Sequence, residues 1–181
     1  MRLKERNSYS RKVLGESLLA VSVISDTERL GGLLRRIGNF DADSFITNFQ
    51  SRLIVQKTIY LMQAFGLNLG YFYNWYIHGP YSPSLAKDAF ALAKTKKTSR
   101  LVRFVDPSME IRFLDFQRFI ENHKSDPVWL EKIASTHFLK TAYHISDPAQ
   151  VFRIVKEKVP SLTSTEFKFL WADLKAKNLV S

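Results

Sequence analysis

The densest chemical signal in the sequence is a run of cations in residues 89–105, which contain five lysines and arginines and no acidic residue. Such side chains bind nucleic acid by neutralising backbone phosphates and releasing counterions, without reading the bases. The alternative is an ordinary solvated loop. Together with cations just outside the run, the predicted phosphate-contacting residues are Lys87, Lys94, Lys96, Lys97, Arg100, Arg103 and Arg112.

A second signal is the concentration of aromatic residues around a Gly-Pro turn in NWYIHGPYSPSL, residues 74–85. Exposed rings beside cations can stack on nucleobases or anchor a protein partner. The candidate stacking or anchoring residues are Tyr73, His78 and Tyr81. The alternative is that all of these rings belong to the hydrophobic core.

No pattern in the sequence specifies catalysis or metal binding. There is no cysteine, glycine-rich phosphate loop, HExxH or GxSxG motif. His137 and His144 lie seven residues apart on one predicted helix, too far for both to chelate one metal ion. His137 also falls on the apolar face of that helix, where a core histidine is the simpler interpretation. We therefore expect a non-enzyme with no catalytic residue, no metal and no cofactor.

The acidic residues give no catalytic cluster either. Asp106, Glu110 and Asp115 form the closest group. Turn chemistry accounts for Asp106, and an exposed strand face shared with Arg112 accounts for Glu110. A nuclease would need carboxylates that converge on a metal, and this spacing does not specify such a site.

The charge balance indicates a polyanionic partner. The chain has 27 lysines and arginines against 17 acidic residues, a formal net charge of +10. A field of this sign attracts nucleic acid, or a protein that carries it. No apolar run approaches the roughly 20 residues that span a bilayer. The cationic and then apolar N-terminus imitates a signal peptide, but Glu16 interrupts it, so we expect a cytoplasmic protein that does not enter membranes.

The first two-thirds of the chain contain one predicted helix that is apolar nearly all round, SRLIVQKTIYLMQAFG at 51–66, with Ser51 as its cap. A helix of this kind is buried, so it is expected to lie at the centre of the core. The aromatic stretch after it favours a strand, because aromatic and β-branched residues occur there without helical period. The other predicted elements are helices at 10–24, 26–37 and 83–93 and a strand at 71–77.

The segment after the cationic run allows two structures. Ile111 and Phe113 alternate with polar residues, which favours a hairpin of 101–105 with 110–114. The competitor is a helix from Pro107 to Ile120. Farther on, two Asp-Pro pairs and the capping box of Thr163 and Glu166 predict three helices. The first two cover 127–144 and 148–158, and the third begins after Thr163.

Helix, strand, helix and basic hairpin is close to the order of a winged helix, whose wing contacts backbone phosphate. We therefore predict a mainly α fold with a small β element. It would have a winged-helix-like core around a buried helix and a C-terminal three-helix portion. The predicted parts are an N-terminal helical arm at 1–48, the core at 49–122 and the C-terminal portion at 127–181.

The stretch IVQKTIYLMQAFGLNLGYFYNWYIHGPYSPSLAKD resembles a signature of small prokaryotic, often archaeal, proteins, and it is distantly similar to Panacea-type antitoxin domains. The C-terminal stretch from LEKIASTHFL to ADLKAKNLV resembles the archaeal group. The resemblance implies a winged-helix-like or mostly helical regulatory protein of defence or toxin–antitoxin systems, and it supplies no catalytic residue. The matching positions are Gln56, Lys57, Tyr60, Leu61, Trp75, Gly79, Pro80, Tyr81 and Ser82.

Two functions follow from these patterns. The first is a non-catalytic nucleic-acid-binding regulator that uses the basic, wing-like surface. The second is a protein-interaction subunit, antitoxin-like or accessory to an Argonaute- or CRISPR-type immune effector, whose basic surface supports a partner's nucleic-acid binding. In the second case we expect the partner to bind through the apolar N-terminal arm.

Overall fold

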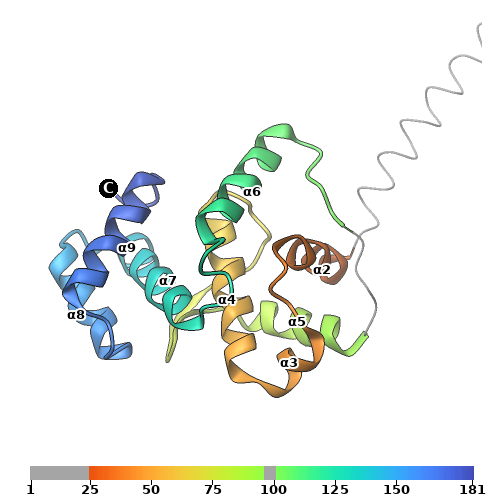
Figure 1. Ribbon diagram of the computed structural model, residues 1–181, viewed down its shortest axis with the longest axis horizontal. Coiled ribbons are helices and arrows are strands. Elements are labelled where there is room, and N and C mark those ends of the chain that lie inside the picture. The colour runs from red at the N-terminus through yellow and green to blue at the C-terminus, as the bar shows by residue number, and fades with distance from the viewer. Residues whose placement is uncertain (1–24, 96–100) are drawn as a thin grey trace, which may run out of the picture.

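The computed structural model describes residues 25–95 and 101–181. The predicted helix at 10–24 and the cations Lys96, Lys97 and Arg100 lie outside these described residues. The described chain is mainly helical with one small antiparallel sheet, so the predicted mainly α class with a small β element is confirmed (Figure 1). Its elements are α2 (Asp26–Ile37), α3 (Ala42–Thr47), α4 (Phe49–Ala64), β1 (Asn74–Tyr76), β2 (Gly79–Tyr81), α5 (Pro83–Thr95), α6 (Pro107–Ile120), α7 (Pro127–Ala142), α8 (Pro148–Lys158) and α9 (Ser164–Ala176).

Helix α4 is the centre of the fold, as its apolar circumference predicts. It lies between α7 on one side and α2, α3 and α5 on the other (Figure 1). It begins earlier than expected, because Asn48 rather than Ser51 caps it by accepting a hydrogen bond from the Gln50 amide at 2.8 Å. Burial continues through consecutive residues of its middle turns, including Gln56 and Lys57, so α4 has no solvent face there.

Helix α2 belongs to the core of this chain. Its Ser25 and Glu28 form a capping box, and its apolar residues Leu30, Leu33 and Leu34 are fully buried. It packs mainly on α5. The described part of the predicted N-terminal arm is therefore not a free apolar surface.

The strand predicted at 71–77 is shorter, at 74–76, and it forms a tight hairpin with a second strand at 79–81, where the Gly-Pro turn was predicted. Asn74 pairs with Tyr81, Trp75 with Pro80 and Tyr76 with Gly79, so only two residues make the turn. Gly79 has a φ of +77°, which L residues rarely adopt, and a Cβ there would overlap the Ser135 hydroxyl of α7. Glycine is therefore required at this position both by the turn and by its packing against α7.

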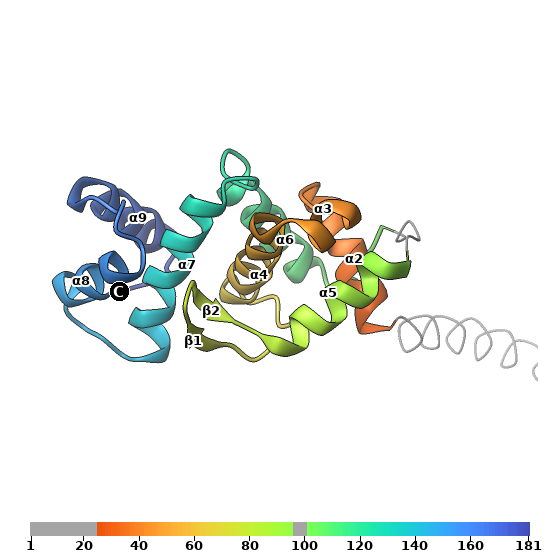
Figure 2. The same cartoon turned by 90° about the horizontal axis from the view of Figure 1, so that it is seen from below.

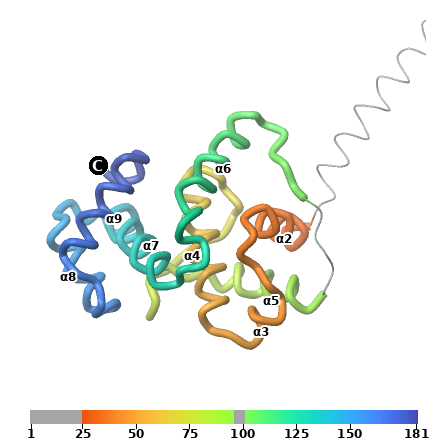
Figure 3. Tube along the Cα trace, in the orientation of Figure 1, coloured from red at the N-terminus to blue at the C-terminus, as the bar shows by residue number. Residues whose placement is uncertain are grey.

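The hairpin predicted for 101–105 and 110–114 is wrong, and the competing helix from Pro107 to Ile120 is correct. Asp106 caps α6 by accepting a hydrogen bond from the Ser108 amide at 2.8 Å, and Pro107 occupies the first turn. Phe113, Phe116 and Ile120 recur with helical spacing and are buried. This periodicity prevails over the short alternation at 110–113, so the expected wing is a helix that runs beside α4 (Figure 3).

Glu110 is consequently not on an exposed strand face. Its carboxylate forms a two-pronged ion pair with Arg36 of α2 and accepts a hydrogen bond from the Phe104 amide at 3.2 Å. Arg36 also donates to the Val102 carbonyl at 3.1 Å. These contacts tie residues 102–110 to α2.

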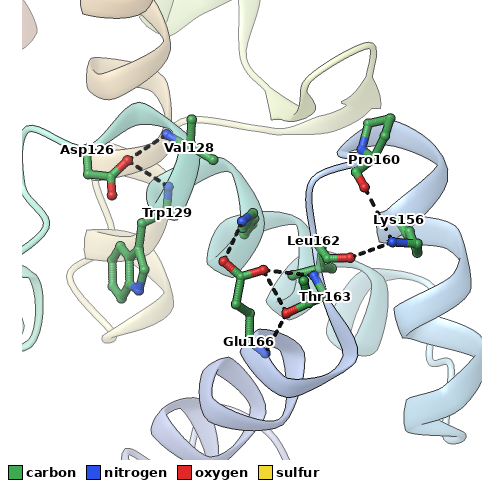
Figure 4. Close-up of polar contacts among 9 residues, drawn as sticks. Asp126, Val128, Trp129, Lys156, Pro160, Leu162, Thr163 and Glu166 are labelled. Carbon is green, nitrogen blue, oxygen red and sulfur yellow. Dashed lines mark hydrogen bonds and ion pairs between the residues drawn. The ribbon is translucent and has the colours of Figure 1, made fainter.

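The C-terminal helices begin where their caps predict. Asp126 and Asp147 cap α7 and α8, and Thr163 forms a capping box with Glu166 at the start of α9. Figure 4 shows this capping box of Thr163 and Glu166. Glu166 also accepts a hydrogen bond from Lys132 of α7 at 3.0 Å, so the cap joins two helices. Figure 2 shows α8 and α9 beyond α7 on the side away from α4. Helix α7 contacts both groups of helices and connects them.

None of the helices in the described part of the chain combines the length and apolar character that crossing a membrane requires.

Candidate binding pocket

The structure contains an open pocket of about 360 Å³ beneath the hairpin turn, between α3, the first half of α4 and α5. Its lining is almost entirely apolar, and its walls carry six aromatic or heteroaromatic rings. A concave, largely apolar surface of this size is typical of a binding site. The six rings belong to Phe45, Phe49, Tyr76, His78, Tyr81 and Phe90.

The mouth of the pocket exposes large apolar side chains. Phe49, Tyr76 and Ile77 are 45%, 59% and 60% exposed. The Phe49 ring lies 4.9 Å from the His78 ring, and the Tyr76 and Tyr81 rings lie 5.6 Å apart, measured between centroids. Exposed apolar side chains around a concave surface are typical of an interaction site.

A buried lysine of α4 is among the lining residues of the pocket. Lys57 is only 2% exposed, and its Nζ donates a hydrogen bond to the Pro80 carbonyl at 2.6 Å. No carboxylate of the described residues forms an ion pair with it. Burial lowers the pKa of Lys57 to about 7, and the charge of Glu131 opposes this effect only in part.

Glu131 and His78 form the polar corner of the site. The His78 Nδ1 lies 3.0 Å from the Glu131 Oε1, and the carboxylate is mostly buried. This contact fixes the imidazole against the Phe49 ring at the mouth. Arg52 of α4 donates hydrogen bonds to the carbonyls of Phe45 and Ile46 at 3.3 and 3.0 Å. These two hydrogen bonds join the end of α3 to α4.

Of the three predicted stacking or anchoring residues, the structure brings His78 and Tyr81 together at the pocket. Tyr73 is placed differently. Its ring packs edge-on against Tyr60 at 5.0 Å, and burial raises its pKa. Its hydroxyl is buried with no hydrogen-bond partner among residues 25–95 and 101–181. Tyr73 directly precedes β1, and the side chains there alternate: exposed Asn74 separates Tyr73 from Trp75, and both of these rings pack inward, Trp75 on Phe138.

The predicted phosphate-contacting residues do not form one surface around a wing. Lys87 and Lys94 are exposed seven residues apart on α5, two turns along one face. Arg103 is exposed in the segment before α6. Arg112 lies on α6, where its guanidinium packs against Gly66 just after α4.

Sequence reasoning missed most of the pocket. Phe45, Phe49 and Phe90 come from three helices, and no local pattern relates them. In the sequence, Gln56 and Lys57 stand out only as positions of the family resemblance. The available signal was a pair of polar residues inside a helix that is otherwise buried all round, since buried polar groups require partners.

His137 is a core residue, in agreement with its predicted place on the apolar face. Its Nδ1 shares a hydrogen bond of 2.6 Å with the Tyr60 hydroxyl. Burial lowers its pKa to about 4, so the imidazole is neutral near pH 7. Across the described residues, no three histidine, aspartate or glutamate side chains come close enough together to hold a metal ion.

Comparisons with known proteins found no match: no family model, curated protein or solved structure corresponds to this chain.

Proposed function

We propose that this protein is a non-catalytic interaction subunit that takes an apolar side chain of a protein partner into the pocket beneath the hairpin turn. The observation that carries this proposal is the open pocket of about 360 Å³, with its aromatic walls and its exposed apolar mouth. Inserted side chains that become fully desolvated in such pockets contribute most of the free energy at protein interfaces.

The chemistry of the partner follows from charge. A chain with a formal net charge of +10 attracts acidic surfaces and repels basic ones. The partner in this proposal is therefore an acidic protein of the same cytoplasmic compartment. An antitoxin-like subunit, or an accessory subunit of an immune effector, would work by such a contact.

The pocket can be tested by filling it. Ala86 lines the pocket on α5, whereas Ala91 is exposed on another face of the same helix. We expect Ala86→Phe to remove a stoichiometric co-purifying acidic protein, because the ring occupies the space that the partner needs. Ala91→Phe adds the same ring on another face of α5, and this variant should retain the partner protein. Equal partner retention in both variants, or a wild-type protein that purifies alone from its native cells, would contradict the proposal.

Nucleic-acid binding is the second candidate function, and it is favoured by the exposed pair Lys87 and Lys94 on one face of α5. Lys168 and Lys175 of α9 provide a matched control, since they are also exposed and seven residues apart. If the α5 pair contacts phosphates, replacing both residues with alanine should lower the slope of log K against log salt by about 2. The α9 pair should leave the slope unchanged. Equal slopes for both double variants would exclude the α5 surface.

A further inference from the structure

We propose that two copies of this chain pair along the outer edge of β1, so that their hairpins form one four-stranded antiparallel sheet. The observation behind this proposal is an open and uncharged strand edge, which is separate from the pocket beneath the hairpin turn. The inference therefore goes beyond the proposed function, and either can fail without the other.

The first argument is that β1 is the open edge of the sheet. The sheet has two strands, and β2 packs on α4 and α7, whereas β1 packs mainly on β2. Side chains of α4 close the β2 edge. Lys57 donates to the Pro80 carbonyl there, and Gln56 exchanges two hydrogen bonds with Ser82 just after the strand. Figure 2 shows β1 on the side of β2 away from α4.

The second argument is the direction of the Trp75 main chain. Trp75 pairs with Pro80, which has no N–H, so this is a non-hydrogen-bonded pair of the ladder. The N–H and the C=O of Trp75 consequently point away from β2. Within residues 25–95 and 101–181, no group outside the hairpin forms a hydrogen bond with either of them. The edge of β1 thus presents one donor and one acceptor from the same residue.

This donor and acceptor make the edge complementary to itself. When two β1 strands pair antiparallel about a two-fold axis at Trp75, each Trp75 N–H donates to the Trp75 carbonyl of the second copy. Asn74 of each copy then lies opposite Tyr76 of the other, and Tyr73 lies opposite Ile77. The pairing covers part of Tyr76 and Ile77, which are 59% and 60% exposed in the single chain.

The third argument is the absence of charge. Residues 58–86, which include both strands, contain no lysine, arginine, aspartate or glutamate. Edge strands that stay unpaired in natural proteins commonly carry charged side chains, which prevent pairing between molecules. Phe72, just before β1, is instead 86% exposed. An acidic protein finds no cation in this stretch, whereas a second copy meets no like charge in it, so the edge fits a second copy better.

Sedimentation equilibrium of the wild-type protein tests the proposal directly. We expect a reversible monomer–dimer equilibrium between about 1 and 500 µM protein. Each copy has a formal net charge of +10 and the contact itself is uncharged, so the dimer should become tighter as salt screens the repulsion. A monomer at every concentration would overturn the proposal and leave the edge to a strand of another protein. A dimer that weakens with salt would contradict the uncharged contact.

Amide hydrogen exchange followed by NMR locates the contact within the dimer. The Trp75 amide should exchange at least about tenfold more slowly in a mostly dimeric sample than in a mostly monomeric one, because the dimer supplies its acceptor. Thr165, an exposed residue in the first turn of α9, should keep its rate. A dimer in which the Trp75 rate is unchanged would overturn the proposed edge.

Two lysine variants with the same added charge provide the matched comparison. Asn74 is exposed in the middle of the paired edge, and Asn122 is exposed after α6. We expect Asn74→Lys to raise the Kd of the dimer at least about tenfold and Asn122→Lys to change it by less than about twofold. Equal Kd values for the two variants would overturn the proposal.

The exchange experiment on the wild type decides the question even if Asn74→Lys does not fold. Ala86→Phe, which fills the pocket, should form dimers as the wild type does. Loss of the acidic partner in that variant with an intact dimer, or a monomeric wild type that retains the partner, separates the two proposals.

Discussion

Gln56 and Ser82 exchange two hydrogen bonds across the fold, as two residues of neighbouring strands would. The Gln56 side-chain amide donates to the Ser82 carbonyl at 3.0 Å, and the Ser82 amide donates to the Gln56 side-chain oxygen at 3.0 Å. The next residue of α4, Lys57, donates a hydrogen bond to the Pro80 carbonyl at 2.6 Å. Two adjacent polar side chains of the central helix thus fix the strand that forms one wall of the pocket.

Replacing Gln56 with leucine should lower the free energy of unfolding by about 1–3 kcal/mol, because it leaves the buried N–H of Ser82 unpaired and leaves the Ser82 carbonyl with only the Ala86 amide as a donor. Urea unfolding followed by far-UV circular dichroism measures the change. Gln50→Leu, at the exposed start of the same helix, should alter it by less than about 0.5 kcal/mol. A similar loss in both variants would show that the exchange with Ser82 adds no specific stability.

Two glycines with the same backbone conformation allow the cost of a left-handed residue to be measured apart from the cost of a steric overlap. Gly79 and Gly70 have φ values of +77° and +81°, but only a Cβ at Gly79 meets other atoms. Gly70→Ala should therefore lose about 1–2 kcal/mol from the left-handed conformation alone. Gly79→Ala should lose clearly more in the same thermal or urea melts, because its methyl group overlaps the Ser135 hydroxyl.

A double-mutant cycle tests this explanation. Ser135→Ala removes the overlapping oxygen, so it should recover part of the stability that Gly79→Ala loses. Strictly additive effects of the two substitutions would show that the contact with α7 is not what makes glycine necessary.

Lys57 should give the protein a stability that rises with pH above neutrality. Burial lowers its pKa to about 7, whereas the unfolded chain keeps the ordinary value of 10.5. Between these values the unfolded state binds more protons, so the free energy of unfolding increases by up to about 1.4 kcal/mol per pH unit. Urea titrations between pH 7 and 9 should show this slope in the wild type and a smaller slope in Lys57→Met. An unchanged slope would mean that Lys57 remains charged in the fold.

Below pH 6.5, His137 should dominate the dependence of the free energy of unfolding on pH, by the same linkage. Its pKa falls to about 4 in the folded protein from an ordinary value of 6.5, because the core disfavours the charged ring. Stability is then fully present above pH 6.5 and decreases by up to about 1.4 kcal/mol per pH unit as the pH falls toward 4. His137→Gln should flatten this decrease, whereas His144→Gln, on an exposed residue after α7, should not. Parallel profiles for both variants would contradict the assignment.

Features that depend on residues close together in the chain could be predicted before the structure was known. Asp126 with Pro127, Asp147 with Pro148 and the pair of Thr163 and Glu166 predict helix starts because the capping atoms lie within a few residues of one another. The burial of α4 also follows from its own composition. The Gly-Pro pair correctly predicts a chain reversal, but Ile77 and His78 make the turn, and Gly79 and Pro80 belong to the strand after it. The mainly α class with a small β element could be predicted for these reasons.

Other features depend on contacts between distant elements. Residues 107–120 carry both a short alternation and a helical period, and the choice depends on burying Phe113, Phe116 and Ile120 against the core. Tyr73 faces inward because Tyr60 packs on it. The rings that line the pocket come from α3, α4, the hairpin and α5, and no spacing along the chain predicts that these elements pack together. Contacts between residues far apart in sequence arise from the packing of whole elements, so local patterns could not reveal the pocket.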